Sequence, residues 1–211
     1  VTSLEFGYKG SLGENTSLNA SLFRYDYTDF QVLQVVGIQT VTRNAGDATV
    51  NGLELEALSN LNDSLSMSYG LTLLDATYGE FLNTNGLEPQ LGQQQLEGKY
   101  LNNAPKVSVN LGLNYTTNLS SGSSLTYRAN AAYKSKIYFS EFNEYSQSAY
   151  TIVDLNLIWE SADDRMRTRF YVKNATDEEY ISGYLSSATG GGRFGQWGYP
   201  RTAGIEIQRN F

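Results

Sequence analysis

Apolar and polar residues alternate along nine separate stretches of this chain. In residues 63–74 (DSLSMSYGLTLL), apolar side chains stand at every second position and small or polar residues fill the places between them. A period of two predicts a β-strand with one apolar and one polar face. The nine apolar faces carry Leu4, Phe6 and Tyr8; Leu18, Ala20 and Leu22; Leu53, Leu55 and Ala57; Leu65, Met67, Tyr69, Leu71 and Leu73; Val107, Val109, Leu111, Leu113 and Tyr115; Leu125, Tyr127, Ala129, Ala131 and Tyr133; Val153, Leu155, Leu157 and Trp159; Phe170 and Val172; and Ala203, Ile205 and Ile207.

The connections between these stretches are alternately short and long. The short ones are rich in Gly, Ser, Asn and Asp, and read KGSLGEN, SNLND, TNLSSGSS and ESADD. The long ones cover about residues 28–48, 77–104, 135–149 and 175–200. Short turns at one end and long loops at the other predict an up-and-down antiparallel sheet with two unlike ends, which is the layout of transmembrane β-barrels.

The strand lengths and the aromatic residues favour a membrane environment for the apolar faces. Each strand supplies the roughly nine to eleven residues that a tilted strand needs to cross a bilayer. Tyr8, Tyr115, Tyr127, Tyr133 and Trp159 fall towards strand ends, where aromatic girdles lie in such barrels. Lipid would then cover the apolar faces and water the polar ones. A soluble barrel or sandwich, acting as a binding module, is the alternative, and the unequal connections favour the membrane barrel.

The composition narrows the possible functions. The chain has no Cys and no His, so disulfides, thiolate chemistry, zinc–cysteine sites and the commonest general base are excluded. We therefore expect neither an enzyme nor a cofactor or metal site. The net charge is -7 and the basic residues are scattered, which argues against a nucleic-acid surface. Apolar runs are too short for a transmembrane helix or a signal peptide, and the start at Val1 suggests a mature fragment.

Four stretches resemble the C-terminal part of the barrel of TonB-dependent outer-membrane receptors. They are RNAGDATVNGLELEA (Arg43–Ala57), LNNAPKVSVNLGLNY (Leu101–Tyr115), VKNATDEEY (Val172–Tyr180) and YPRTAGIEIQRNF (Tyr199–Phe211). In order and spacing the resemblance covers essentially the whole chain. Ala175 departs from it, because the family usually has a larger aliphatic residue there.

The resemblance implies a barrel of 22 strands with a separate N-terminal plug domain inside it. Residues 1–211 would form the last nine strands, without the plug and the earlier strands. An open sheet of nine strands has edges that lipid cannot satisfy, so the chain would not be an autonomous barrel. Because nine is odd, its two ends would lie on opposite sides of the membrane.

The implied function is active transport of a scarce nutrient chelate, most often a ferric siderophore, across the outer membrane of a Gram-negative bacterium. The implied partners are outer-membrane lipid, a small-molecule metal chelate, the barrel-assembly machinery, and a TonB-type energising protein that acts through the plug. The alternative is a passive porin or the translocating barrel of an autotransporter. The substrate stays open between siderophores, cobalamin-like molecules and oligosaccharides.

Glu54 and Glu56 share the polar face of one strand. Paired carboxylates can perform acid–base chemistry such as glycoside hydrolysis, but the sequence offers no partner residues for it. The resemblance implies that carboxylates of this motif face the plug and pair with its arginines. A charge pair within the sheet is the structural alternative.

Basic residues gather on the polar faces of the later strands: Arg128, Lys134, Arg167, Arg169 and Lys173, with Asp154 and Glu206 on flanking strands. We expect cross-strand neutralisation, as at Arg169. A patch that steers anionic chelates is the alternative.

Two of the long connections contain candidate ligand contacts. In Ile137–Tyr150 these are Tyr138, Phe139, Phe142 and Tyr145, which would either stack on a ligand or pack among neighbouring loops. The stretch GGGRFG (residues 190–195) formally matches a dinucleotide-binding motif, but a strand follows it instead of a helix. It is predicted to be a mobile loop, in which Arg193 and, beyond it, Trp197 contact a ligand or the plug.

The chain ends in Phe211, which continues the apolar face of Ile205 and Ile207. This ending resembles the signal by which barrels are recognised for insertion into the outer membrane. The alternative is a strand that ends in Phe by chance.

Overall fold

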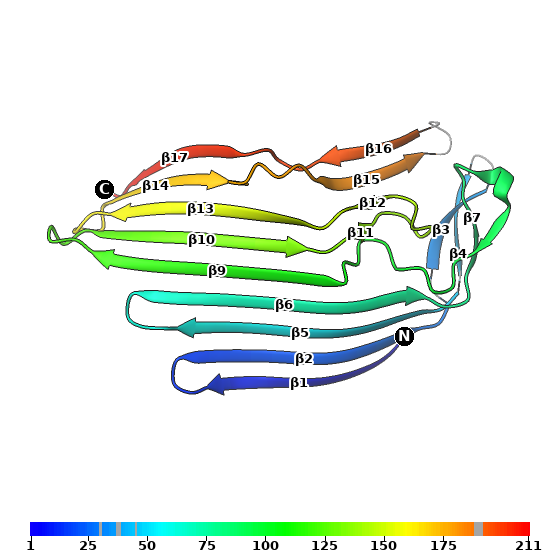
Figure 1. Ribbon diagram of the computed structural model, residues 1–211, viewed down its shortest axis with the longest axis horizontal. Helices are drawn as coiled ribbons and strands as arrows, with labels where there is room; N and C mark the ends of the chain where they lie inside the picture. Colours follow the sequence, from blue (N-terminus) through cyan, green and yellow to red (C-terminus); the bar gives the residue numbers. More distant parts are fainter. Residues whose placement is uncertain (30, 37–38, 45, 188–191) are drawn as a thin grey trace.

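The computed structural model describes residues 1–29, 31–36, 39–44, 46–187 and 192–211, in which nine long strands form one antiparallel sheet (Figure 1). Each strand pairs with the next one along the chain, so the predicted up-and-down order is confirmed. The strands are β1 (Thr2–Leu12), β2 (Thr16–Tyr27), β5 (Ala48–Asn60), β6 (Leu65–Tyr78), β9 (Val107–Asn118), β10 (Ser124–Lys134), β13 (Tyr150–Glu160), β14 (Met166–Lys173) and β17 (Thr202–Arg209).

The sheet has two unlike ends, as predicted. Tight hairpins join the strands at one end, here called the turn end, and the long connections lie at the other, the loop end (Figure 1). Gly13 (φ 66°) and Gly122 (φ 82°) supply the left-handed backbone that two of the tight turns require. The N-terminus lies at the loop end and the C-terminus at the turn end, which agrees with the odd number of strands.

The long connections are more regular than the sequence suggested. Within the described residues they form four two-stranded sheets and one 3₁₀ turn, η1 (Pro89–Leu91). The hairpins are β3 (Gln31–Val36) with β4 (Gln39–Asn44), β7 (Leu82–Thr84) with β8 (Gln93–Gln95), β11 (Ile137–Tyr138) with β12 (Ser146–Gln147), and β15 (Ile181–Ser187) with β16 (Gly192–Trp197).

The prediction of a mobile loop at GGGRFG was wrong for residues 192–195. They belong to β16 and pair with β15, from Ser187 opposite Gly192 to Ile181 opposite Trp197. Glycines carry no side chain, so a glycine-rich strand shows no alternation of apolar and polar side chains. The pairing of its backbone could therefore not be predicted from the sequence pattern. Residues 190 and 191 lie outside the described residues.

The strand register divides the side chains of the sheet into two faces. Residues directly opposite each other share a face. One continuous row runs from Ala20 through Leu55, Leu71 and Val109 to Tyr133, and it defines the apolar face. The next row runs through Ser21, Glu54, Thr72, Ser108 and Lys134, and it defines the polar face.

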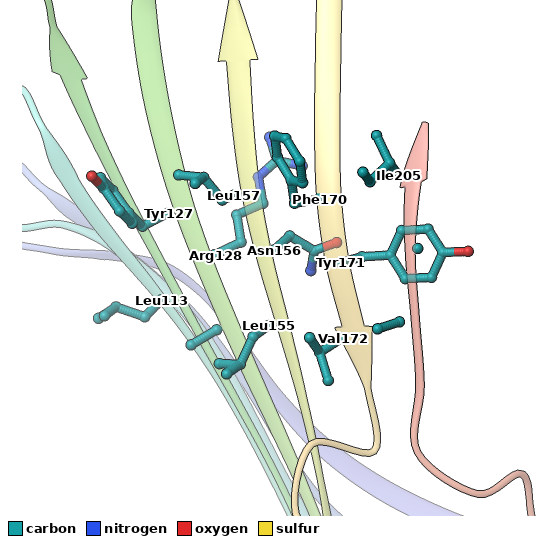
Figure 2. A pocket seen from close by; sticks show the side chains of 13 residues that line it. Leu113, Tyr127, Arg128, Leu155, Asn156, Leu157, Phe170, Tyr171, Val172 and Ile205 are labelled. Carbon is teal, nitrogen blue, oxygen red and sulfur yellow. The ribbon is translucent and has the colours of Figure 1, made fainter. Parts of the chain in front are cut away.

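No layer of protein covers the apolar face in the described part of the chain. Phe6 is 67% exposed, Leu22 58% and Ile205 63%. A second sheet packed on this face would have buried such side chains. Where β9, β10, β13, β14 and β17 meet, the sheet has a depression of about 750 Å³ with almost wholly apolar walls, including Leu155, Phe170 and Ile205 (Figure 2). The apolar face therefore presents hydrocarbon outward.

Two glycines on the polar face are covered by aromatic rings from neighbouring strands. The ring of Phe23 lies over Gly52, its cross-strand partner, in the space that a Cβ atom would occupy. The ring of Tyr171 covers Gly204 in the same way and lies across β17 (Figure 2). Ring-over-glycine contacts of this kind hold the register of a sheet.

No helix in the described residues is long and apolar enough to cross a membrane.

Candidate functional site

Among the described residues, a compact hydrophobic core lies at the loop end of the sheet. Tyr78 at the end of β6, Phe81 and Leu96 from the connection after it, and Phe142 from the connection between β11 and β12 pack together with 6% exposure or less. The rings of Tyr78 and Phe81 lie 5.4 Å apart. This core joins two connections that are far apart in the sequence.

Hydrogen bonds to the backbone fix these two connections against each other. The Asn143 side chain accepts a hydrogen bond from the Tyr100 backbone N–H (2.8 Å) and donates one to the Tyr100 carbonyl oxygen (2.8 Å). The Lys99 ammonium donates to the carbonyl oxygen of Phe142 at 2.9 Å. Asn143 adopts a left-handed backbone (φ 56°), which Asn tolerates better than most residues. The loop end is consequently an ordered platform.

Two glutamates of the β11–β12 connection are held by asparagines of the β6–β9 connection. Asn83 donates to Glu141 Oε1 at 3.2 Å, and Asn85 donates to both carboxylate oxygens of Glu144, at 3.2 and 3.0 Å. Burial raises the pKa of Glu141 above its ordinary value of 4.5, and the charge of Glu144 acts in the same direction. The folded platform therefore favours the protonated form of Glu141.

Three aromatic rings stack where the β11–β12 connection meets β15. Tyr184 of β15 stacks on Phe139 at 5.7 Å between ring centroids and on Tyr145 at 5.4 Å, with interplanar angles of 14° and 17°. The Arg193 guanidinium lies 4.2 Å from the centroid of the Tyr145 ring, a cation–π contact. Stacked rings next to a cation form a surface that suits a flat or conjugated ligand.

Arg193 also pairs with two carboxylates from different connections. Its Nη2 atom lies 3.2 Å from Glu88 Oε1 and 3.6 Å from Glu144 Oε2. About a third of each of these three side chains is exposed. One arginine thus links the β15–β16 hairpin to the other two connections of the platform.

The structure separates the six residues that the sequence singled out as candidate ligand contacts. Phe139, Tyr145 and Arg193 belong to the stack, and Trp197, 67% exposed, shares a face of β16 with Arg193 because the two are four positions apart in one strand. Phe142 is 6% exposed in the loop core and presents no ring outward. Tyr138 stacks instead on Tyr100, with centroids 5.9 Å apart.

Glu54 and Glu56 lie on the polar face, as their alternation predicted. Glu54 stands between Ser21 and Thr72, and Glu56 between Asn19 and Gly70. Both are exposed, and neither forms an ion pair with any described residue. The alternative that Glu54 and Glu56 form charge pairs within the sheet is therefore not supported by the described residues.

A hollow of about 450 Å³ adjoins Glu56 and is walled in part by Asn19, Ser68, Gly70 and Asn110. Small side chains on β6 and β9 leave this space open on the polar face. Glu56 thus borders a space that other groups can enter.

Basic residues of the later strands are partly neutralised across the sheet. Arg169 Nη2 lies 3.5 Å from Glu206 Oε2, directly opposite, so Arg169 is neutralised across the sheet as expected. Arg167 lies 3.5 Å from Glu160 on β13. Arg128, Lys134 and Lys173 form no ion pair within the described residues and add positive charge to the polar face. This face is therefore acidic near Glu54 and basic on β10 and β14.

The C-terminal residues lie on or beside the apolar face at the turn end. Ile207 is 68% exposed, and Phe211 follows β17 as a freely exposed ring. The Arg209 guanidinium lies 5.3 Å from the centroid of this ring. Nothing in the described chain covers Phe211, which leaves it accessible to another molecule.

Sequence reasoning missed Tyr184, Glu88 and Glu144 as members of the loop-end site. The connections show no periodicity, and their partners lie 39 to 105 positions apart.

A family model described as TonB dependent receptor-like, beta-barrel matches residues 1–175. The Ferrioxamine B receptor of Salmonella typhimurium is 22% identical over 173 residues, which are 81% of this chain and 23% of that protein. The chain therefore spans about a quarter of the length of the curated relatives it matches.

Solved structures agree with the fold. The ferric yersiniabactin uptake receptor FyuA from Yersinia pestis superimposes with a TM-score of 0.81 at 22% identity, over 99% of this chain and 29% of that one. The siderophore receptor PiuA from Acinetobacter baumannii gives a TM-score of 0.77 at 22% identity, over 97% of this chain and 27% of that one. The family match covers most of the chain and includes the strands that carry Glu54 and Arg169. The chain belongs to the family of TonB-dependent receptor-like β-barrels.

Proposed function

We propose that the chain is a nine-stranded part of the wall of an outer-membrane receptor that imports a ferric siderophore with energy from the TonB system. The observation that carries this proposal is the division of the sheet into a continuous uncovered apolar face and a polar face. Lipid on one side and water on the other account for both faces of each strand. Family membership and the names of the Salmonella and Yersinia relatives support the siderophore.

The loop end is the proposed ligand-binding surface. Phe139, Tyr145, Arg193 and Trp197 are its proposed contacts, because stacked rings and a guanidinium offer apolar area together with hydrogen-bond donors. Phe142 is proposed to support the surface from beneath, whereas Tyr138 stacks on Tyr100 and is not among the proposed contacts. The platform beneath them is pre-organised by hydrogen bonds between connections, which lowers the cost of ordering loops on binding.

The polar face is proposed to surround a plug domain that lies elsewhere in the full-length protein. Glu54 and Glu56 are its proposed contacts, since both are exposed and free of ion pairs in the described chain. If they hold arginines of the plug, Glu54→Lys lowers uptake in the full-length receptor while chelate binding at the loop end stays unchanged. Equal uptake by this variant would count against the contact.

The proposal is tested by growth and binding. A strain that lacks the full-length receptor is supplied with single ferric siderophores as its iron source, and binding of each chelate to the purified receptor is measured. The proposal expects at least one chelate to bind and to support growth only when the receptor and the proton-motive force are present. Uptake that continues after uncoupling would favour a passive porin instead, and failure of every iron chelate to bind would redirect the search to sugars or vitamins.

A further inference from the structure

Basic side chains of β10 and β14 form a line on the polar face of the sheet. Lys134 belongs to the row that defines this face, and Arg128 lies an even number of positions before it in β10, so both side chains leave on the same side. Arg128, Asn156 and Tyr171 stand directly opposite one another on β10, β13 and β14, which places Tyr171 on the polar face as well. The basic residues of β14 lie at even distances from Tyr171. The basic line therefore consists of Lys134, Lys173, Arg128, Arg169 and Arg167.

The members of this line follow one another from the loop end towards the turn end. Lys134 and Lys173 are the last residues of β10 and β14, at the loop end. Arg128 lies in the row of Tyr171, which is the next row of the polar face after Lys173. Arg169 and Arg167 occupy the two rows after that, towards the turn end. Successive rows on one face are about 7 Å apart, so the charges are spaced along the wall and do not form a single cluster.

Only the members nearest the turn end have carboxylate partners. Arg169 is paired with Glu206 and Arg167 with Glu160, each at 3.5 Å. In the part of the chain that the structure describes, Lys134, Lys173 and Arg128 are exposed and form no ion pair. The positive charge of the line is therefore unbalanced in its loop-end half and balanced in its turn-end half.

The remaining carboxylate on these strands does not neutralise the free cations. Asp154 of β13 stands opposite Asn130 on β10, and its Oδ1 atom accepts a hydrogen bond from the backbone N–H of Asn174 at 2.9 Å. It forms no ion pair with a described lysine or arginine. Asp154 is thus held by the backbone at the end of β14.

The ring of Tyr171 stands between the two halves of the line. The Arg169 guanidinium lies 4.9 Å from its centroid and the Lys173 ammonium 6.0 Å, both within the range of cation–π contacts. The ring itself covers Gly204 and lies across β17 (Figure 2). A ring fixed in this way keeps the neighbouring cations along the wall.

We propose that Lys134, Lys173 and Arg128 guide an anionic ferric chelate along this wall, from the loop end into the barrel. A concave surface lined by charges of one sign concentrates ligands of the opposite sign and speeds their association. Several separate cations, each of which binds weakly, also allow an anion to pass from one to the next, because no single site retains it. The inference rests on the proposed function and adds the charge class of the substrate to it.

An anionic chelate explains the arrangement better than an acidic surface of the plug domain. The chelate enters at the loop end, where the cations lack partners, and leaves past Arg169 and Arg167, where they are neutralised. A permanent contact with the plug gives no reason for this division along the wall. The plug therefore becomes an outcome that the test has to exclude.

The test measures uptake of radioactive iron by cells that produce the full-length receptor. Anionic ferric catecholates and carboxylates and uncharged ferric hydroxamates are supplied in turn. The variants are Arg128→Gln/Lys134→Gln/Lys173→Gln and Arg128→Lys/Lys134→Arg/Lys173→Arg, of which the second keeps the charges. Lys9→Gln is the matched control, because Lys9 is an exposed cation on the polar face of β1, opposite Asn19 and outside the line.

We expect the wild type to import an anionic chelate and the triple glutamine variant to import it about tenfold more slowly. Salt should slow the wild type and have little effect on the triple glutamine variant, since screening acts on the charges that this variant lacks. Uptake of any uncharged chelate should be equal in the two. The charge-keeping variant and Lys9→Gln should match the wild type in every measurement.

Equal uptake of the anionic chelate by the wild type and the triple glutamine variant would overturn the inference. Equal slowing of anionic and uncharged chelates, together with a lower thermal stability of the variant receptor, would show that the cations hold the plug and would overturn it as well. A wild type that imports only uncharged chelates would also overturn it, yet would leave the proposed function standing. A wild type that imports no ferric chelate would overturn the proposed function itself.

Discussion

The Arg193 guanidinium lies 3.2 Å from the carboxylate of Glu88, although 105 positions separate the two residues in the sequence. The same guanidinium lies 3.6 Å from Glu144 and 4.2 Å from the Tyr145 ring. Arg193 is therefore the point at which the β15–β16 hairpin, the β6–β9 connection and the β11–β12 connection are joined.

Replacing Arg193 is expected to loosen the β15–β16 hairpin. Partly exposed ion pairs and a cation–π contact contribute about 0.2–1 kcal/mol each, so Arg193→Ala should lower the local opening free energy by about 1–2 kcal/mol. Hydrogen exchange of the β15 and β16 amides in the full-length receptor measures this. Arg165→Ala, which removes an exposed arginine at the turn end, is the control and should leave the hairpin unchanged. Unchanged exchange in Arg193→Ala would contradict the joining role.

The buried carboxyl of Glu141 is expected to make the platform sensitive to pH. Because its folded pKa is raised, the folded state holds the proton more tightly than the unfolded state between the ordinary value of 4.5 and the raised one. The stability that Glu141 contributes is thus fully present below the ordinary value of 4.5 and is lost as the pH rises through the folded pKa. Hydrogen exchange in the β11–β12 connection should quicken beyond the intrinsic change as the pH rises above the ordinary value of 4.5 and through the raised pKa of Glu141.

Glu141→Gln removes the titrating group and should abolish this extra pH dependence. Glu97→Gln, an exposed glutamate in the β6–β9 connection, is the matched control and should retain it. If the pH dependence that Glu141→Gln removes were a gain of stability with rising pH, the predicted direction of the effect would be wrong.

The ring of Phe23 over Gly52 predicts a strict requirement for glycine. Gly52→Ala places a Cβ atom where the ring lies, so the ring must leave its position at a cost of about 1–3 kcal/mol. Thermal unfolding of the full-length receptor, followed by its mobility on gels, would report the loss. Gly7→Ala is the control, because a Cβ atom there meets only the Ala20 carbonyl oxygen at 3.8 Å.

A second substitution distinguishes ring displacement from other causes. Phe23→Ala in the Gly52→Ala background should recover part of the lost stability, since the ring that clashes is gone. Additive losses in the double variant would show that the two residues do not interact.

The freely exposed Phe211 is expected to act during assembly, not in the finished receptor. Deletion of Phe211 should lower the amount of receptor in the outer membrane several-fold, measured by fractionation and immunoblotting. Phe211→Tyr keeps an aromatic ring and should preserve the level. Phe194→Ala, which removes an exposed ring from β16, controls for the general loss of an aromatic residue. An unchanged level after the deletion would exclude the signal.

The sheet was predictable from the sequence because successive side chains of a strand point to opposite faces. The two faces of each strand lie in different surroundings, so apolar residues such as Leu71 alternate with polar residues such as Thr72. This alternation continues along most of β6. The same logic placed Glu54 and Glu56 on the polar face and Ile205 and Ile207 on the apolar one. Cross-strand neutralisation of Arg169 was predictable because neighbouring strands of an up-and-down sheet are neighbours in sequence, and the structure shows that Glu206 supplies it.

The loop end was not predictable in the same way. Tyr138, Phe139 and Phe142 look alike in the sequence, yet one ring stacks on Tyr100, one stacks on Tyr184 and one lies in the loop-end core. Their positions depend on partners such as Tyr100, Tyr184 and Leu96, which no local pattern connects with them. The hairpin that contains Arg193 is paired through glycine-rich backbone, which carries no side-chain signal.

The central claim is that lipid hydrocarbon covers the apolar face, and spin-label accessibility tests it most directly. The chain contains no cysteine, so single cysteines at Leu71, Val109, Thr72 and Ser108 can be labelled selectively in a full-length receptor whose other cysteines have been removed, reconstituted into a bilayer. Labels at Leu71 and Val109 should collide with oxygen, which dissolves in lipid, and not with a water-soluble nickel chelate. Labels at Thr72 and Ser108 should show the opposite preference or be shielded from both. Nickel accessibility at Leu71 and Val109, or shielding of these two positions from oxygen as well, would contradict the account.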